Sequence, residues 1–401
     1  MLDGRRLWFV GIGGAGMSAL ALVAREWGAE VGGSDRSRSS YIERLEAAGV
    51  PVTIGHDAAN VPAGAEVIVS SAIAPDNPEL ARHTVRRRGE LLAELVAMRP
   101  SIVVAGAHGK TTTAAMIAFC LDRLGLDPSF LIGGEIPQLD GNARAGQGWL
   151  VAEGDESDRS LELLRPQIAV VTNVELDHHA TFASEEEVRE LFGRWLAKAP
   201  AQVKGEDLEP IGFELGIPGE HNRRNAAVAL AALELADVPR ADAERVLPDF
   251  RGVGRRLERR GEAGGVEVFD DYGHHPSEIA ATLAAARSAV NGGRVLVVFQ
   301  PHLYSRTRHL AADLASALAA ADAVAVTEIY AAREDPVAGV SGKLVVDALA
   351  AERPGMPVAW TPSLEDAVRF LSRRARPGDL VLTIGAGDVE RAGPLILEEL
   401  A

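Results

Sequence analysis

An apolar run at residues 102–105, IVVA, leads directly into the sequence GAHGKTTT at residues 106–113. Glycines at positions 106 and 109 let the backbone turn tightly enough for several N–H groups to converge on one phosphate. Lys110 would reach the outer phosphates, and the Thr111 hydroxyl would lie on Mg²⁺. The following segment, TTTAAMIAFCLDRLG, is compatible with a helix, whose N-terminus favours an anion. A GK pair that arose by chance would lack these flanking elements, so the stretch predicts a nucleoside triphosphate site.

Short apolar runs alternate with amphipathic stretches along the whole chain. Runs of roughly four to seven apolar residues separated by helices are typical of parallel strands buried on both faces. The alternation restarts at about residue 99 and again at about residue 251. We therefore predict an α/β fold of three domains, each built on a mostly parallel sheet with flanking helices. We expect Rossmann-like outer domains at residues 1–98 and 251–401, and a central domain at 99–250 that carries the phosphate loop.

The predicted elements follow from these runs and the turns between them. Predicted strands lie within residues 7–12, 29–35, 50–55, 65–73, 101–110, 149–157, 168–178, 266–273, 294–300, 323–330, 356–360 and 380–387. Predicted helices of the last domain cover residues 277–290, 307–321, 342–352 and 363–374.

Composition and charge narrow the class of protein. A chain of 401 residues with 47% hydrophobic residues can bury several cores, and its net charge of −16 argues against nucleic-acid partners and anionic membranes. The single cysteine, Cys120, excludes an intrachain disulfide. Residues 7–24 are uncharged, but the glycines in their middle would break a membrane-spanning helix. The stretch therefore predicts a strand, a turn and a helix rather than a signal or membrane segment. We expect a cytoplasmic protein without membrane insertion, and the sequence leaves its oligomeric state open.

The segment GIGGAG, at residues 11–16, matches the pattern GxGxxG directly after a predicted strand. Asp35 ends the next predicted strand, where an acidic residue commonly contacts a ribose hydroxyl. Glycines at a helix N-terminus allow the close approach of a diphosphate, which NAD, FAD and UDP-sugars all carry. On these residues alone the identity of the diphosphate ligand stays open.

Two polar residues follow the central predicted strands. Glu153 comes after one short apolar run, and His178 comes after the next. Because parallel strands end at the same sheet edge, both side chains are expected near Thr111, and the three would bind Mg²⁺. The neighbouring acidic residues 155, 156 and 158 fit a solvated loop equally well, and His179 is ambiguous in the same way.

A set of motifs occurs in order along the chain: GIGGAGMSALA, SSAIAPDNPEL, GAHGKTTT, VAEGDESD, VTNVELDHHATF, GEHNRRNA, FRGVGRRLE, DDYGHHPSEI, FQPHLYSRT and TEIYAAREDPVAGVSG. In these motifs the chain resembles the Mur ligases over nearly its whole length. The resemblance implies a UDP-sugar-binding domain at 1–98, an ATP-binding domain at 99–250 and an amino-acid-binding domain at 251–401. It also implies that the loop around Gly13 holds a UDP-sugar rather than NAD.

The motifs DDYGHHP and PHLYSRT imply the alanine-adding branch of this family. The implied reaction joins L-alanine to the lactyl carboxylate of UDP-N-acetylmuramate through an acyl phosphate, in peptidoglycan precursor synthesis. ATP and Mg²⁺ are the implied cofactors.

The resemblance also implies roles for individual residues. Those implied to bind the nucleotide are Gly106, His108, Gly109, Lys110, Thr111, Thr112, Asn173, His221, Asn222, Asn225, Arg255 and Asp271. Those implied to bind the UDP-sugar or the amino acid are Gly11, Gly13, Gly14, Gly16, Asp35, Ser70, Ser71, Tyr272, His274, His302 and Arg306. The implied metal ligands are Thr111, Glu153 and His178. Catalytic roles fall to Lys110, His178, His274, His302 and Arg306, and the sequence does not choose which histidine transfers the proton.

The chain departs from the family pattern in two places. Between about Lys198 and Pro218 the family carries a much longer segment with extra strands. We expect the remaining residues to cross the surface and the core sheet to survive, because the nucleotide motifs flank the gap on both sides. Leu303 also stands where many relatives have arginine, which removes one charge from the substrate pocket.

Other functions compete with the ligase. A nicotinamide-dependent oxidoreductase would account for GxGxxG and Asp35 but for none of the later motifs. A UDP-sugar-binding relative with a disabled ATPase would account for the shortened segment. A ligase that attaches a recycled tripeptide to the same sugar would share the nucleotide motifs.

Overall fold

The computed structural model describes residues 1–70, 72–81, 83–177, 181–290, 292–332 and 334–401. The chain forms two compact units. The first comprises residues 1–176, 184–215 and 224–251, and the second comprises residues 177–183, 216–223 and 252–401. The first unit holds two sheets and the second holds one, so the predicted α/β class with three mostly parallel sheets is confirmed.

The first sheet of the first unit is entirely parallel, with strand order β3-β2-β1-β4-β5. Its centre is β1, where residues 7–10 are all buried because they form an uninterrupted apolar run. The edge strand β5 has the sequence TVRR, which lacks such a run and was not predicted. The strands are β1 (Arg6–Val10), β2 (Glu30–Asp35), β3 (Val52–Ile54), β4 (Glu66–Val69) and β5 (Thr84–Arg87), and the helices are α1 (Ala15–Glu26), α2 (Ser40–Ala47) and α3 (Arg88–Ala97).

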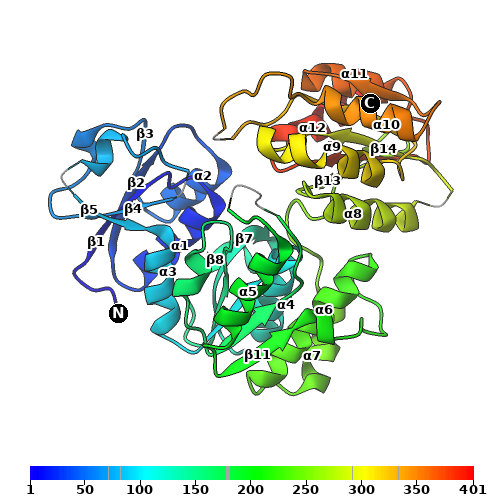
Figure 1. Cartoon of the computed structure of the whole chain (residues 1–401). Coiled ribbons are helices and arrows are strands. Elements are labelled where there is room, and N and C mark those ends of the chain that lie inside the picture. The colour runs from blue at the N-terminus through cyan, green and yellow to red at the C-terminus, as the bar shows by residue number, and fades with distance from the viewer. Residues whose placement is uncertain (71, 82, 178–180, 291, 333) are drawn as a thin grey trace. The chain divides into compact units, whose positions relative to one another are not determined.

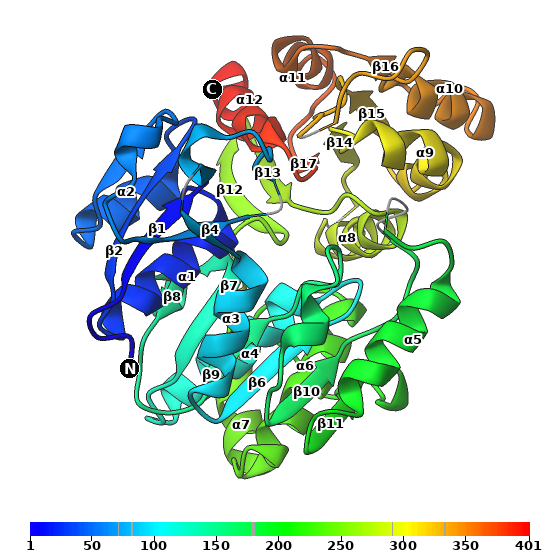
Figure 2. The same cartoon turned by 60° about the vertical axis from the view of Figure 1, so that its left-hand side comes forward.

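The second sheet has the order β11-β10-β6-β9-β7-β8, parallel except for the antiparallel pair β7 and β8 (Figures 1 and 2). The fully buried β6 leads through the phosphate loop into α4, which begins at Lys110 and is buried on every face from residue 111 to 121. The strands are β6 (Ser101–Ala105), β7 (Ser129–Ile136), β8 (Gly141–Arg144), β9 (Leu150–Glu153), β10 (Ile168–Val171) and β11 (Ala201–Lys204), and the helices are α4 (Lys110–Arg123), α5 (Glu185–Leu196), α6 (Glu220–Leu235) and α7 (Arg240–Val246).

The shortened segment follows α5. Its first part forms β11, a four-residue edge strand that pairs with β10 and was not predicted. Only Val203 of this strand is buried, so its sequence gave no apolar run to identify it. A short turn at residues 205–207 and irregular chain then lead to α6. The parallel strands that carry the nucleotide motifs are all present.

The second unit contains a sheet with the order β12-β13-β17-β14-β15-β16. Only β12 is antiparallel, and it turns into β13 through Gly264 and Gly265, whose φ angles of 57° and 74° suit a two-residue hairpin. This polar strand and α12 were not predicted. The strands are β12 (Glu258–Ala263), β13 (Val266–Asp271), β14 (Val295–Phe299), β15 (Ala323–Val326), β16 (Val358–Trp360) and β17 (Leu380–Ile384), and the helices are α8 (Pro276–Ala289), α9 (Tyr304–Leu318), α10 (Lys343–Glu352), α11 (Leu364–Ser372) and α12 (Ala392–Leu400).

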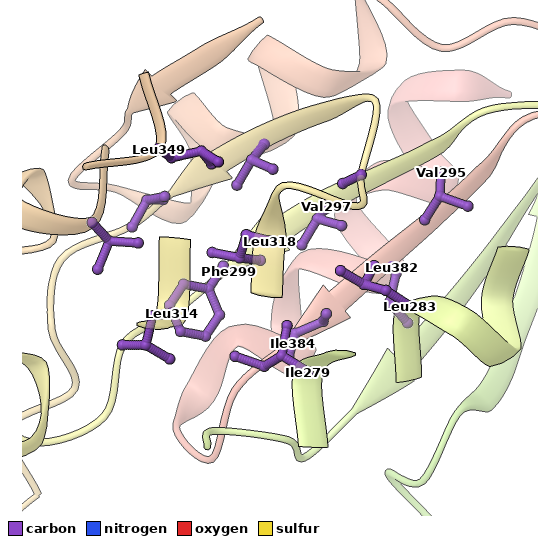
Figure 3. Packing of buried hydrophobic residues seen from close by; sticks show 14 of the residues in the cluster. Ile279, Leu283, Val295, Val297, Phe299, Leu314, Leu318, Leu349, Leu382 and Ile384 are labelled. Atoms are coloured by element: carbon purple, nitrogen blue, oxygen red, sulfur yellow. The ribbon is translucent and has the colours of Figure 1, made fainter. Parts of the chain in front are cut away.

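Both faces of this third sheet are covered by helices. Val297 and Phe299 of β14 pack with residues of α8, α9 and α10, as Figure 3 shows. The intervening Leu296 and Val298 pack with residues of α11 and α12. Because successive residues of a strand point to opposite faces, a strand that is covered on both sides must be apolar throughout, as β14 is.

Among the described residues, no helix is both long enough and apolar enough to cross a membrane. The uncharged residues 7–24 form β1, the glycine loop and most of α1.

Candidate active site

The phosphate loop joins β6 to α4 in a conformation that depends on glycine. Gly106 and Gly109 have φ angles of 129° and 76°, which side chains larger than hydrogen rarely adopt. The loop is held from the neighbouring strand end: the His108 amide donates to Asn173 Oδ1 at 2.9 Å, and its carbonyl accepts from Asn173 Nδ2 at 3.0 Å. Asn173, predicted to bind nucleotide, is therefore placed against this loop.

The Lys110 ammonium lies within the same loop. It donates to the carbonyl oxygens of Gly106 and Ala107 at 2.5 and 3.2 Å, and to Glu156 Oε1 at 2.9 Å. Burial disfavours the charged ammonium, but the carboxylates of Glu156, Asp155 and Glu153 together outweigh it and raise the pKa of Lys110. Glu156 itself is only 4% exposed. The interpretation of this residue as part of a solvated loop is wrong, because its carboxylate is needed to balance a buried ammonium.

Two of the three predicted metal ligands lie together. Thr111 Oγ1 donates to Glu153 Oε2 at 3.0 Å, and the second Glu153 oxygen accepts from the Gly133 amide at 2.5 Å. Glu153 ends β9 beside β6, so both residues reach the carboxyl edge of the sheet, as the sequence predicted. His178, the third predicted ligand, lies outside the described residues.

The residues of the GEHNRRNA motif are divided between the two units. Asn225 lies against the phosphate loop, since a Cβ added to Gly109 would stand 2.3 Å from its Oδ1. His221 and Asn222 belong to the second unit, where Asn222 Nδ2 donates to the Pro218 carbonyl at 2.6 Å. Burial, with Arg256 nearby, lowers the pKa of His221, which favours a neutral imidazole.

We expect Gly109→Ala to raise the KM for ATP by about tenfold or more. The added methyl group would meet Asn225, and a left-handed φ strains any L-residue by about 1–2 kcal/mol. Gly125→Ala is a matched control, because its φ of 74° imposes a similar strain while a Cβ would meet nothing within 4 Å. Steady-state kinetics at varied ATP and denaturant unfolding of both variants test this. Equal KM values would show that the Asn225 contact does not shape the loop.

The N-terminal glycine loop is held by Asp35. Its Oδ2 accepts from the Gly13 amide at 2.8 Å, and a Cβ at Gly13 would approach that oxygen to 3.0 Å. Gly11 has a φ of 81°, and a Cβ there would lie 3.7 Å from Ser70 Oγ. These predicted residues are therefore neighbours, whereas Ser71 lies outside the described residues.

Arg88, which the sequence analysis did not identify, lies beside the start of α1. Gly14 is the N-cap of this helix, and a Cβ at Gly16 would stand 2.8 Å from Arg88 Nη1. The other end of the guanidinium donates to Asp155 Oδ2 at 2.7 Å. The glycine loop thus has a cation at the helix terminus where an anion is expected to bind.

Four predicted substrate residues come together in the second unit. The ring of His274 lies 5.7 Å from the ring of Tyr272 and 5.7 Å from that of His302, centre to centre. His302 Nδ1 lies 3.0 Å from Nη1 of Arg306. The four residues follow β13 or β14, whose carboxyl ends share one sheet edge. Their contact with substrate stays a prediction.

Asp177 and Tyr330 complete this cluster and were missed as site residues. Asp177 accepts from Arg306 Nη2 at 2.8 and 3.0 Å and from Nε at 3.2 Å, in a bidentate pair whose members are 6% and 5% exposed. Tyr330 stacks on His302 with ring centres 5.9 Å apart. Both lie inside the quoted motifs VTNVELDHHATF and TEIYAAREDPVAGVSG, which was the only available signal.

Leu303 has a strained backbone, with a φ of 68°. Its amide donates to the Tyr330 carbonyl at 3.0 Å, and its carbonyl accepts from the Thr307 amide at 3.1 Å. Such non-glycine strain costs about 1–3 kcal/mol and is concentrated at functional sites. Position 303 therefore has a strained backbone, although its leucine side chain carries no charge.

Arg255 and Asp271, predicted to reach the nucleotide, are engaged within their own sheet. Arg255 Nε donates to Asp270 Oδ2 at 2.9 Å, and Nη2 donates to the Gly385 carbonyl at 2.8 Å. The two Asp271 oxygens accept from the amides of Leu257 and Gly273, each at 2.8 Å. Burial raises the pKa of Asp271 to about 6. In this arrangement the side chains order the loops around β13.

His274 is held neutral by its surroundings. Burial lowers its pKa to about 4, against an ordinary value of 6.5. A neutral imidazole can donate or accept a hydrogen bond near pH 7, but so low a pKa makes it a weak proton acceptor.

This shift predicts a pH-dependent contribution to stability. Between pH 6.5 and 4 the unfolded chain binds a proton at His274 that the folded protein does not, so the free energy of unfolding falls as the pH is lowered through this window. Relative to His274→Gln, the wild type should therefore lose stability from pH 7 to pH 4.5. Asp271 titrates in the opposite sense in both proteins and cancels in the difference. Urea unfolding at the two pH values tests this, and a pH-independent difference would contradict it.

Models of three Mur ligase domains match most of the chain. The Mur ligase family catalytic domain matches residues 6–99, the Mur ligase middle domain matches 104–203, and the Mur ligase glutamate ligase domain matches 255–387.

Curated relatives and solved structures agree with these matches. A UDP-N-acetylmuramate–L-alanine ligase of Streptomyces coelicolor is 42% identical over 98% of this chain and 97% of its own. The ligase of the same name from Renibacterium salmoninarum is 43% identical over 99% and 96%. The Streptomyces alignment spans 451 positions against 401 residues here, so that protein has residues without a counterpart. The crystal structure of the UDP-N-acetylmuramate–alanine ligase of Thermotoga maritima has a TM-score of 0.83 at 27% identity and covers 98% of both chains. This chain therefore belongs to the Mur ligase family.

Proposed function

We propose that this protein is an ATP-dependent ligase that joins L-alanine to the lactyl carboxylate of UDP-N-acetylmuramate in peptidoglycan precursor synthesis. The observation that carries the proposal is that a phosphate loop in which Lys110 contacts Glu156 and Thr111 contacts Glu153 occurs in a chain more than 40% identical to ligases of that name. The cluster around His274 and Arg306 adds a second polar site suited to a small charged substrate.

The three domains divide the substrates. Residues 1–98 bind the UDP-sugar, with its diphosphate on the glycine loop at the start of α1. Residues 99–250 bind ATP on the phosphate loop, and residues 251–401 bind the amino acid. The cluster of Tyr272, His274 and His302 at one sheet edge of that domain supports the last assignment.

Mg²⁺ fits the central site. The Thr111 hydroxyl and the Glu153 carboxylate lie 3.0 Å apart, and oxygen atoms are the ligands that this cation prefers. These two residues would hold the ion, and His178 remains the third predicted ligand. When bound, Mg²⁺ would offset negative charge on the phosphates.

The reaction follows from charge and position. Lys110 and the amides of the phosphate loop stabilise the γ-phosphoryl group while the lactyl carboxylate attacks it, which releases ADP and forms an acyl phosphate. The neutral amine of alanine then attacks the acyl carbon, and inorganic phosphate leaves as the amide forms. ATP cleavage supplies the free energy for joining a carboxylate to an amine in water.

The test is ADP formation by the purified chain with UDP-N-acetylmuramate and a panel of amino acids. Alanine-dependent ADP formation is expected, since the strands that carry the nucleotide motifs survive the shortened segment. Activity only with the tripeptide L-alanyl-γ-D-glutamyl-diaminopimelate would indicate a recycling ligase. Binding of the UDP-sugar without ADP formation for any amine would indicate a binding protein with a disabled ATPase.

A further inference from the structure

The first turn of α9, the helix that carries Arg306, is capped by a residue from a distant loop. The helix follows Leu303, whose apolar side chain cannot accept a hydrogen bond, and its first turn contains no acidic residue. Amides in the first turn of a helix lack partners within the helix, and a negative charge near them is stabilising. Glu334, in the loop between β15 and α10, supplies both. The Ser305 amide donates to one oxygen of Glu334 at 2.8 Å, and the Ser305 hydroxyl donates to the other.

The same loop also holds the turn that precedes α9. The Tyr330 amide donates to the Pro301 carbonyl at 2.8 Å, and the Tyr330 carbonyl accepts from the Leu303 amide at 3.0 Å. The base of the loop is closed by the Glu328 carboxylate, which accepts from the Gly342 amide at 3.3 Å. The loop is therefore fastened at its base and along the turn, and Glu334 fastens it to the helix.

These contacts set the places of two predicted substrate residues. His302 comes directly before Leu303, and Arg306 comes three residues after it. Leu303 has a φ of 68°, and such a conformation of a non-glycine residue persists only where its surroundings impose it. Without the carboxylate on the first turn of α9, Leu303 would relax. The His302 ring, which stacks on Tyr330 and lies beside His274, would then move.

We propose that Glu334 is a positioning residue of the amino-acid site, which acts through the first turn of α9 on the places of His302 and Arg306. This inference rests on the proposed function, which supplies the alanine-dependent reaction. Glu334 acts through Ser305, which donates to both of its oxygens. The phosphate loop and the glycine loop belong to the other unit, so the effect of Glu334 falls on the use of alanine alone.

Steady-state kinetics on the full chain test the inference. Glu334→Ala should raise the KM for alanine by about tenfold or more, the loss expected when a hydrogen bond to a charged group is broken. The KM values for ATP and for UDP-N-acetylmuramate should stay unchanged. Glu334→Gln keeps one acceptor for Ser305, so its KM for alanine should lie between those of Glu334→Ala and the wild type. Asp335→Asn is the matched control: it removes a charge from the adjacent exposed residue and should change none of these values.

A double-mutant cycle tests the route by which Glu334 acts. Ser305→Ala removes the hydroxyl donor and keeps the amide. Two residues that act through one shared interaction have non-additive effects, so Ser305→Ala should change little when Glu334 is already alanine. Additive effects on the KM for alanine would show that Glu334 acts independently of Ser305 and would overturn its positioning role.

A second measurement does not depend on catalysis. The NMR signals of the His302 ring, identified by their loss in His302→Gln, should shift in Glu334→Ala and stay in place in Asp335→Asn. Denaturant unfolding shows whether each variant is folded. If Glu334→Ala is unfolded, Glu334→Gln is measured in its place, with a smaller shift in the same direction expected.

The outcomes distinguish the two proposals. Absence of alanine-dependent ADP formation by the folded wild type would overturn the proposed function, and the His302 signals would then decide the role of Glu334. Unchanged His302 signals in the folded Glu334 variant, or a lower kcat with every KM unchanged, would overturn the role of Glu334 and leave the ligase function intact.

Discussion

Replacement of Lys110 by alanine is expected to lower ADP formation by about a hundredfold to a thousandfold, the usual loss when one preorganised charge-stabilising donor is removed. Lys110 is the lysine of the phosphate loop, and its ammonium group donates hydrogen bonds to a carbonyl oxygen of that loop and to Glu156. No neighbouring side chain in the described part of the loop would replace its charge on the γ-phosphoryl group. The measurement is kcat for ADP release at saturating UDP-N-acetylmuramate, alanine and ATP.

The control must separate catalysis from folding. Lys110→Ala alone leaves the buried Glu156 carboxylate without its ammonium, which costs several kcal/mol of stability in comparable pairs, about 3–5. The double variant Lys110→Ala/Glu156→Gln removes both charges, so it should recover stability but not activity. A folded double variant with turnover near that of the wild type would remove Lys110 from the mechanism.

Arg306→Ala should lower the free energy of unfolding by about 3–5 kcal/mol and abolish ligation. The pair with Asp177 is almost fully buried, so removing the guanidinium takes away the cation that balances a buried carboxylate. It also deprives His302 Nδ1 of its neighbour at 3.0 Å. Denaturant unfolding and alanine-dependent ADP formation give the two readouts.

A double variant without either charge separates the effect of Arg306 on stability from its effect on ligation. Because apolar residues of similar volume often replace a buried ion pair without loss, Arg306→Met/Asp177→Leu should unfold at a denaturant concentration close to that of the wild type. Its ligase activity should remain lost if Arg306 contacts the substrate. Recovery of activity along with stability would show that the arginine serves the fold alone.

Local sequence patterns determined most of the secondary structure. The apolar runs of β1, β6, β10 and β14 are buried on both faces and gave parallel strands, and GAHGKTTT gave the strand–loop–helix turn. The convergence of Thr111 with Glu153 also followed, since residues after parallel strands meet at one sheet edge. The grouping of Tyr272 and His274 with His302 was implied by the family resemblance instead, and the structure brings these rings together. Five strands were missed. The edge strands β5, β8, β11 and β12 carry no apolar run, and in β7 two glycines interrupt the apolar run after residue 132.

Only the tertiary structure decided which charges are paired. Glu156 pairs with Lys110, 46 residues away in the sequence, and Asp177 pairs with Arg306, 129 residues away. Glu79 accepts a hydrogen bond from Ser34, 45 residues away. In the sequence each of these carboxylates resembles any exposed acidic residue. Burial sets their roles, because a carboxylate removed from water must find donors or a cation, and the fold alone determines which side chains are within reach.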